Sequence, residues 1–268
     1  MDSFVIFIVG PAASGKSTLA ATVLRAFPTF TFVSDLVALK ELAHVNDCFQ
    51  TMIAIQQQER YRSFSQEIED LRGSFWNERS ARKAQALDAG ELRTEHLETV
   101  RTTDGGFRIL DPAVWDDALS QTMASLENGG SHVVEFARGT DTKYLEYRAI
   151  SPRQVYHSAF AIVAASRSRV VLDQSLIIHV SAVRAERERR NHLRRVRGEH
   201  YVSQETMDEV YADDVFTFDR SNQGDHQLGI LSADLPIAVI SVDNTPPDPE
   251  ANFSPVIEFL RRYVSLGV

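Results

Sequence analysis

Short, mainly apolar runs alternate along this chain with longer stretches in which apolar residues recur every three or four positions. The apolar runs lie at residues 4–9, 29–33, 132–136, 176–180 and 237–242. Such runs are typical of strands in a parallel sheet, where both faces are buried. Helical spacing is found at residues 18–27, 112–126, 152–166, 203–214 and 255–264. This alternation predicts an α/β fold of three layers, a parallel sheet between two layers of helices.

The segment from residue 36 to about residue 100 departs from this alternation. Its pattern is helical and strongly polar, and it is too long for an ordinary connection between a strand and a helix. A turn at residues 104–106 and a short apolar run at 107–110 follow it. We therefore predict that residues 36–110 form an inserted helical subdomain, within a single domain that spans residues 1–268.

A glycine-rich motif follows the first apolar run directly. Residues 10–17, Gly-Pro-Ala-Ala-Ser-Gly-Lys-Ser, match the G-x-x-x-x-G-K-[ST] pattern, with a strand pattern before them and a helix pattern after them. In that setting, backbone N–H groups and the helix N-terminus bind phosphate. Lys16 would bridge the β- and γ-phosphates, and the Ser17 hydroxyl would hold Mg²⁺. The residues predicted to bind a nucleoside triphosphate are Gly10, Ala12, Ala13, Ser14, Gly15, Lys16, Ser17 and Thr18.

Three charged residues follow predicted strands, where open α/β sheets place their ligands. Asp35 is a candidate base that accepts a proton from a hydroxyl, although it also suits the N-cap of a following helix. Glu135 is a candidate magnesium ligand acting through water, and its alternative is a solvent-facing strand end. Arg138 is a candidate contact to an anionic substrate, and its alternative is a surface salt bridge. Asp35 and Arg138 are thus the predicted substrate-binding residues.

Arginine is concentrated in one short segment. Seven arginines fall within residues 184–197, and on a helix Arg187, Arg190, Arg194 and Arg197 share one face. A nearly pure cationic face suits an anionic partner, for which a triphosphate is the obvious candidate. The alternative is that these arginines pair with acids of the predicted helix at 203–214.

Composition narrows the class of protein. The net charge of −9 argues against a general polyanion-binding surface, and the single cysteine, Cys48, suits a reducing cytosol. The first apolar run is too short for a membrane span and lacks the basic flank of a signal peptide, so we expect a cytoplasmic protein. No cluster of cysteine and histidine predicts a zinc site.

The chain resembles the P-loop kinases of the nucleoside monophosphate kinase-like group, which includes adenylate kinases, small-metabolite kinases and the kinase domain of polynucleotide kinases. The resemblance rests on residues 10–17, on Asp35, and on the join at 177–184 between a strand and the arginine-rich helix. It implies a P-loop NTPase fold with an arginine-rich lid at residues 183–214. It also implies that Arg187, Arg190 and Arg194 are catalytic, that Asp35 is the base, and that Asn244 lies beside adenine. Ala13 departs from the family pattern, which often has glycine there.

These observations favour an enzyme that uses ATP and Mg²⁺ to phosphorylate a hydroxyl group. The acceptor is a hydroxyl of a nucleoside, a nucleotide or another polar metabolite, and the insertion at 36–110 stands where the family builds its acceptor site. Two alternatives stay open, a kinase acting on a hydroxyl of DNA or RNA, and a regulatory NTPase that switches a partner protein. The absence of a GTPase-type base motif leans towards ATP over GTP, whereas the sequence leaves the oligomeric state open.

Overall fold

The computed structural model describes residues 4–35, 38, 99–101, 107–109, 112–126, 130–166, 174–197, 201–220, 227–246 and 248–265. The first half of the chain contributes β1 (Val5–Val9), α1 (Lys16–Ala26), β2 (Thr31–Ser34), β3 (Thr99–Arg101), β4 (Phe107–Ile109), α6 (Ala113–Ala124) and β5 (His132–Phe136). The second half contributes α7 (Thr142–Arg148), η2 (Pro152–Gln154), α8 (Val155–Ser166), β6 (Ser175–Ser181), α10 (Arg184–Val196), α11 (Gln204–Glu209), β7 (Asp219–Arg220), β8 (Gln227–Ile230), β9 (Ala238–Asp243) and α12 (Pro249–Ser265).

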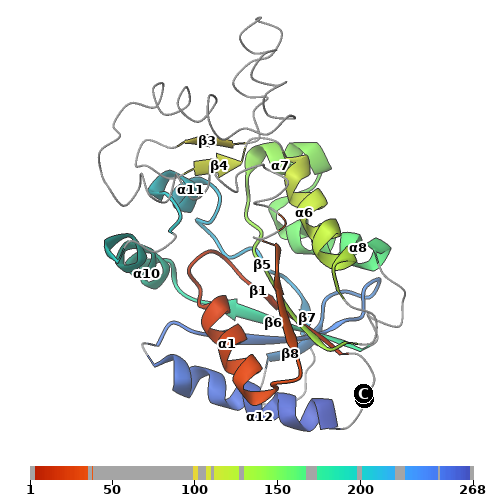
Figure 1. Cartoon of the computed structure of the whole chain (residues 1–268). Coiled ribbons are helices and arrows are strands. Elements are labelled where there is room, and N and C mark those ends of the chain that lie inside the picture. The colour runs from red at the N-terminus through yellow and green to blue at the C-terminus, as the bar shows by residue number, and fades with distance from the viewer. Residues whose placement is uncertain are drawn as a thin grey trace, which may run out of the picture.

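A mostly parallel sheet forms the centre of the molecule (Figure 1). Over the described ranges it has seven strands in the order β2-β5-β1-β6-β9-β8-β7. The first five of these run parallel, and β8 and β7 extend the sheet antiparallel beyond β9. β1 thus lies between β5 and β6, and its carboxyl end carries the glycine-rich loop into the middle of the sheet edge.

The two faces of the sheet are covered by different helices, which confirms the predicted three-layer α/β fold. Ile6 and Ile8 of β1 belong to a core cluster with residues of α1 and α12. Phe7 and Val9 point to the opposite face and join a cluster with residues of α6 and α8. Figure 1 shows α1 and α12 together on one side of the sheet. β1 is buried at every position because its alternate side chains pack into both clusters.

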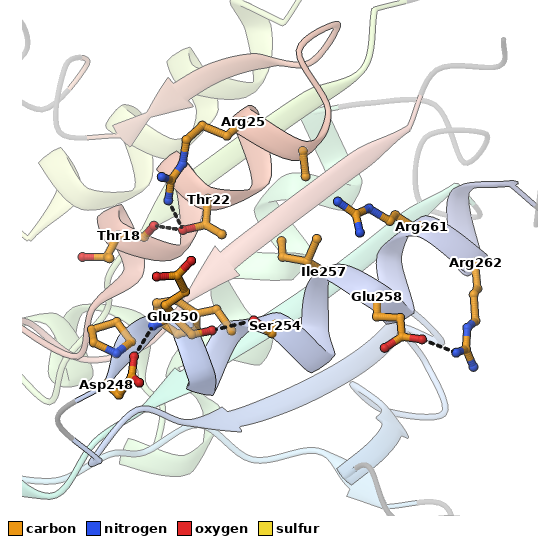
Figure 2. A pocket seen from close by; sticks show the side chains of 13 residues that line it. Thr18, Thr22, Arg25, Asp248, Glu250, Ser254, Ile257, Glu258, Arg261 and Arg262 are labelled. Atoms are coloured by element: carbon orange, nitrogen blue, oxygen red, sulfur yellow. Dashed lines mark hydrogen bonds and ion pairs between the residues drawn. The ribbon is translucent and has the colours of Figure 1, made fainter.

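A groove runs between α1 and α12 on the outside of their shared layer. Figure 2 shows Thr18, Thr22 and Arg25 of α1 on one side of it and residues of α12 on the other. α12 begins earlier than the predicted start at residue 255. The Asp248 carboxylate accepts the backbone N–H groups of Glu250 and Ala251, each at 3.1 Å, so this side chain caps the helix and Pro255 lies inside it.

Other elements also differ from the sequence-based expectation. The helix predicted over 203–214 ends at Glu209, whereas α7, β7 and β8 were not predicted. The predicted helical insertion at 36–110 lies almost wholly outside the described residues. Its described part includes β3 and β4, which form a two-stranded antiparallel sheet. No helix in the described ranges is both long and apolar enough to cross a membrane.

Phe7 should contribute strongly to folding, because its ring is fully buried and lies 5.2 Å from that of Phe160. We expect Phe7→Ala to lower the free energy of unfolding by about 3–5 kcal/mol. The matched control is Phe32→Ala on β2, where the side chain is 45% exposed and the loss should stay below about 1 kcal/mol. Urea denaturation measures both losses, and equal losses would contradict the assignment of Phe7 to the core.

Candidate functional site

The loop between β1 and α1 has positive φ angles at three residues, two of which are glycines. Gly10 and Gly15 have φ angles of 148° and 108°, and Ala13 is also left-handed with a φ of 59°. Glycine adopts this region at no steric cost, whereas alanine does so at a cost of about 1–2 kcal/mol. Gly15 has a second constraint, since a Cβ atom there would lie 2.2 Å from Asn244 Nδ2. Glycine at position 13 would therefore suit this backbone better than the alanine found there.

Lys16 opens α1 and folds back over the loop. Its ammonium donates to the Pro11 carbonyl at 2.8 Å, and its side chain is buried. Burial lowers the pKa of the Lys16 ammonium, whereas Glu135 and then Asp35 act to raise it. Within the described residues this ammonium uses one of its three donors, which leaves two for a ligand. The neighbouring Ser14 hydroxyl is buried without a described partner, as expected for a loop that closes around a polar group.

The two predicted magnesium ligands lie side by side. Ser17 Oγ donates to Glu135 Oε1 at 3.0 Å, which links the first turn of α1 to the end of β5. A hydroxyl and a carboxylate are oxygen ligands of the kind that Mg²⁺ prefers, with phosphate and water completing its coordination. No group of three or more histidine, cysteine, aspartate or glutamate residues in the described ranges forms a metal site independent of phosphate. Ser17 and Glu135 thus present oxygen atoms of the type that suits Mg²⁺, and their role as magnesium ligands stays a prediction.

Asp35 lies buried at the carboxyl end of β2 and is held there by Arg138. Arg138 Nη1 donates to Asp35 Oδ2 at 2.6 Å, and both side chains are at most 9% exposed. Burial raises the pKa of the Asp35 carboxyl, whereas Arg138 and then Lys16 act to lower it. A carboxylate whose pKa is raised by burial is better suited to accept a proton than an exposed one.

The guanidinium of Arg138 is enclosed. It also donates to the carbonyl groups of Ala137 and Trp115, at 2.7 and 3.0 Å, and lies over the Trp115 ring. Its Nε atom is buried without a described partner, and Arg138 lines a small cavity of about 10 Å³ together with Tyr144. Contact between Arg138 and an anionic substrate stays a prediction, while the geometry shows Arg138 fixing the position of Asp35.

The arginine-rich helix α10 presents its arginines at three depths. Arg187 is the deepest, with its side chain only 2% exposed. Its guanidinium donates to the carbonyl groups of Ala182, Tyr211 and Ala212, at 3.1, 2.6 and 3.0 Å. Two of these contacts tie α10 to the segment after α11, and the predicted catalytic role of Arg187 in the lid stays a prediction.

Arg190 lies next along the helix and touches the glycine-rich loop. It donates to the Ser14 carbonyl at 3.0 Å, to the Asn244 carbonyl at 2.5 Å and to Glu186 at 2.8 Å. Arg194 and Arg197 lie further out and line a pocket of about 250 Å³ beside Ala13 and Gly15. Arg194 is close enough to Lys16 to lower the pKa of its ammonium. Within the described part of the chain, neither Arg194 nor Arg197 has a hydrogen-bond or ion-pair partner, so both are available to an anion.

The alternative for this helix is pairing with acids of the helix predicted over 203–214, and it holds for Arg184, whose partner Asp208 lies there. Arg184 pairs with Asp208 and Glu188, and Arg189 pairs with Glu186. The other acids concerned, Glu186 and Glu188, belong to α10 itself. The four arginines that helical spacing places on one face of α10 therefore differ in their surroundings, since Arg187 and Arg190 bind protein carbonyl groups and Arg194 and Arg197 line a pocket.

Asn244 follows β9 and lies against the loop with a side chain 1% exposed. Its Nδ2 donates to the Ser14 carbonyl at 2.8 Å, and its Oδ1 accepts from Asn252 Nδ2 at 3.0 Å. Asn244 also lines the pocket beside Arg194. The predicted contact with adenine stays untested, but both ends of the amide already have protein partners.

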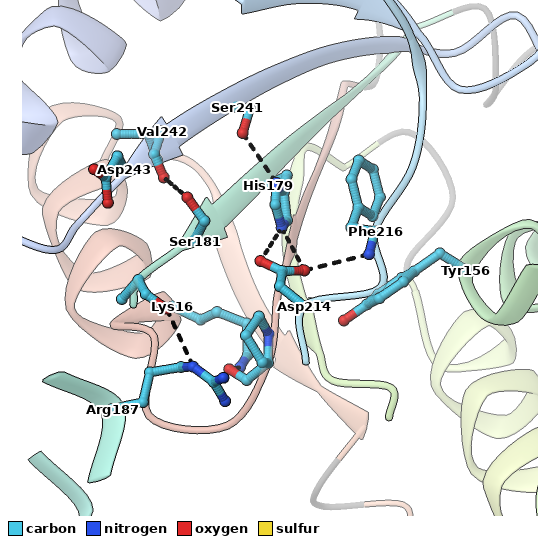
Figure 3. A network of polar contacts seen from close by, with 12 residues as sticks. Lys16, Tyr156, His179, Ser181, Arg187, Asp214, Phe216, Ser241, Val242 and Asp243 are labelled. Atoms are coloured by element: carbon cyan, nitrogen blue, oxygen red, sulfur yellow. Dashed lines mark hydrogen bonds and ion pairs between the residues drawn. The ribbon is translucent and has the colours of Figure 1, made fainter. Parts of the chain in front are cut away.

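A buried polar network near Lys16 was missed by the sequence analysis. Figure 3 shows Ser241, His179 and Asp214 in line, with the His179 ring between the other two. His179 Nδ1 lies 3.0 Å from Ser241 Oγ, and its Nε2 lies 2.9 Å from Asp214 Oδ2. The ring stacks on Phe216 at 4.4 Å. The available signal is a histidine inside the otherwise apolar run 176–180, where a buried polar side chain requires a partner.

The segment around α11 packs on the glycine-rich loop. Met207, Val210 and Tyr211 form a small apolar cluster with Ala12. The Val210 carbonyl also accepts the backbone N–H of Thr140 at 2.8 Å. The loop is therefore contacted both by α10, through Arg190, and by the segment around α11.

Comparisons with known proteins support no family assignment. No family model and no curated protein matches the chain. Solved structures with similarity include a candidate kinase from Chloroflexus aurantiacus J-10-fl, which is 12% identical over 100% of both chains with a TM-score of 0.47. Another is TT1252 from Thermus thermophilus, 18% identical over 74% of this chain and 78% of its own, with a TM-score of 0.26. Both TM-scores are below 0.5, so neither similarity supports a conclusion about this chain. The fold assignment rests on the strand order described above.

The left-handed backbone at position 13 generates a stability prediction. Ala13→Gly should raise the free energy of unfolding by up to about 1 kcal/mol, because relief of the steric cost outweighs the extra entropy of glycine in the unfolded chain. Ala12→Gly is the matched control, since Ala12 has no positive φ and packs on Met207. This control should lose about 0.5–1 kcal/mol. Urea denaturation of both variants tests the difference, and a loss of stability in Ala13→Gly would contradict it.

Proposed function

We propose that this protein is a kinase that transfers the γ-phosphoryl group of ATP, bound with Mg²⁺, to a hydroxyl group of a nucleoside, a nucleotide or another polar metabolite. The observation that carries the proposal is a buried carboxylate, Asp35, at the same sheet edge as the loop lysine, Lys16. Each of the two groups acts on the pKa of the other. A phosphate-binding loop alone suits any NTPase, whereas a buried base beside it suits transfer to a hydroxyl.

The loop supplies the triphosphate site. Lys16 has free donors for the β- and γ-phosphate oxygens, and the N-terminus of α1 adds its positive end. Ser17 and Glu135 would hold Mg²⁺, which neutralises charge on the phosphates when bound. Arg194 is the guanidinium that supports charge on the migrating phosphoryl group, because it lies close enough to Lys16 to act on the pKa of its ammonium and lines the pocket beside the loop. Arg187 and Arg190 each direct three N–H donors at protein oxygens instead.

Asp35 acts on the acceptor. Its carboxylate takes the proton of the hydroxyl group while the hydroxyl oxygen forms a bond to the γ-phosphorus. The bond from that phosphorus to the β,γ-bridging oxygen breaks, and ADP leaves with the electron pair of that bond. Arg138 holds the carboxylate in place throughout, since its guanidinium is fixed by the carbonyl groups of Ala137 and Trp115.

The direct test is consumption of ATP by the purified protein with and without a panel of hydroxyl compounds, including a 5′-hydroxyl oligonucleotide. We expect turnover that depends on a small-molecule acceptor, and Lys16→Ala should lower that turnover by at least about 100-fold through loss of charge stabilisation. Phosphorylation of the oligonucleotide alone would favour a polynucleotide kinase. Turnover independent of every acceptor would favour a regulatory NTPase and contradict the proposal.

Asp35→Asn tests the base. It should lower kcat by about 100- to 10,000-fold while changing the dissociation constant of MgATP little, because Asp35 acts on the acceptor and not on the nucleotide. Calorimetry measures the binding, and a coupled ADP assay measures the rate. The substitution leaves the charge of Arg138 unbalanced, so Asp35→Asn/Arg138→Gln is the companion variant in which both charges are removed. Full transfer activity in either variant would remove Asp35 from the mechanism.

A further inference from the structure

One peptide group of the glycine-rich loop is held from outside the loop by two donors. The Ser14 carbonyl accepts from Asn244 Nδ2 at 2.8 Å and from Arg190 Nη1 at 3.0 Å. The two donors come from segments far apart in the sequence, the end of β9 and the middle of α10. Both lone-pair positions of this carbonyl oxygen are therefore occupied by protein.

The donors are themselves fixed. Asn244 Oδ1 accepts from Asn252 of α12 at 3.0 Å, and the Asn244 backbone N–H donates to the Ser181 carbonyl at 2.8 Å. Arg190 Nη2 donates to the Asn244 carbonyl at 2.5 Å, and its Nε donates to Glu186. Neither side chain can turn towards a nucleobase without breaking several of these bonds.

This arrangement determines where the next N–H group points. A trans peptide group is planar, so its carbonyl and its N–H point in opposite directions. Because the Ser14 carbonyl is directed at Asn244 and Arg190, the Gly15 N–H is directed away from them. In the described part of the chain this N–H has no acceptor. The close approach of Asn244 to the loop also explains why residue 15 is glycine, because a Cβ atom there would lie 2.2 Å from Asn244 Nδ2.

We infer that Asn244 and Arg190 are positioning residues of the phosphate loop: they fix the Ser14–Gly15 peptide so that the Gly15 N–H binds the triphosphate, and the Asn244 amide does not read the base. The inference rests on the triphosphate binding in the proposed function and deepens it. Base selectivity between ATP and GTP is accordingly assigned to groups other than this amide.

The test separates positioning from base reading by using a ligand that has no base. Dissociation constants of the magnesium complexes of ATP, GTP and inorganic tripolyphosphate are measured by calorimetry for the wild-type chain and Asn244→Ala. Losing one hydrogen bond to a buried carbonyl should weaken all three ligands by the same factor, about fivefold to tenfold. A changed ratio of ATP to GTP with unchanged tripolyphosphate binding would overturn the inference, as would unchanged binding of all three.

Two further variants keep the test informative if Asn244→Ala is poorly folded. Asn252→Ala removes the partner that orients the amide, although Asn252 does not line the pocket of about 250 Å³ beside Asn244 and Arg194. It should weaken all three ligands equally but by a smaller factor. Thr245→Ala is the matched control on the same loop, because within the described residues Thr245 forms hydrogen bonds with Val183 and Asp243 and not with residues 10–15. Equal effects of Asn252→Ala and Thr245→Ala would count against the inference.

A direct readout comes from the Gly15 amide resonance in NMR spectra. Tripolyphosphate should shift this proton downfield in the wild-type chain, and the shift should be smaller in Asn244→Ala and unaltered in Thr245→Ala. A merely structural role of Asn244 would leave that shift unaltered in both variants. Absence of any binding by the wild-type chain would refute the proposed function as well, whereas wild-type binding with a base-selective loss in Asn244→Ala would refute only the positioning role.

Discussion

Burial of β1 on both faces is the constraint on which the rest of the structure depends. Its alternate side chains fill two separate core clusters, and β1 lies inside the sheet between β5 and β6. Its carboxyl end then delivers the glycine-rich loop between the ends of β5 and β6. Glu135 and His179 enter the same region from these neighbouring strands, and Asp35 enters from β2 beyond β5. These polar side chains lie close together because the carboxyl ends of parallel strands meet at a common edge of the sheet.

Buried charge is the second organising feature, and it is balanced in different ways at different positions. Asp35 and Arg138 balance each other directly, whereas Arg187 is surrounded by neutral carbonyl groups. A buried guanidinium needs such acceptors because leaving one of its donors unpaired costs free energy. The same residue type thus serves as scaffold at Arg187 and Arg190 and remains open to a ligand at Arg194 and Arg197.

The sequence predicted the parts of this molecule that follow local rules. The run at 4–9 and the motif at 10–17 predicted β1, the loop and α1 because apolar patterning and glycine spacing are local signals. Helical spacing predicted that Arg187 and Arg194 lie on the same face of a helix. It could not predict that Arg187 is buried and Arg194 lines a pocket, because this difference depends on where the segment after α11 packs. The network of His179 and Asp214 was missed because its members lie 35 residues apart and meet only through tertiary structure. β7 and β8 escaped prediction since their few residues carry little pattern.

The three carbonyl contacts of Arg187 have a consequence for how α10 can rearrange. Two of them lie at residues 211 and 212, so rotation of the first turns of α10 as a rigid body would break several buried hydrogen bonds together. The first turns of α10 are therefore fixed to the neighbouring segment by the hydrogen bonds of Arg187. Any movement of α10 that keeps these bonds and those of Arg190 is confined to the later turns, which carry Arg194 and Arg197.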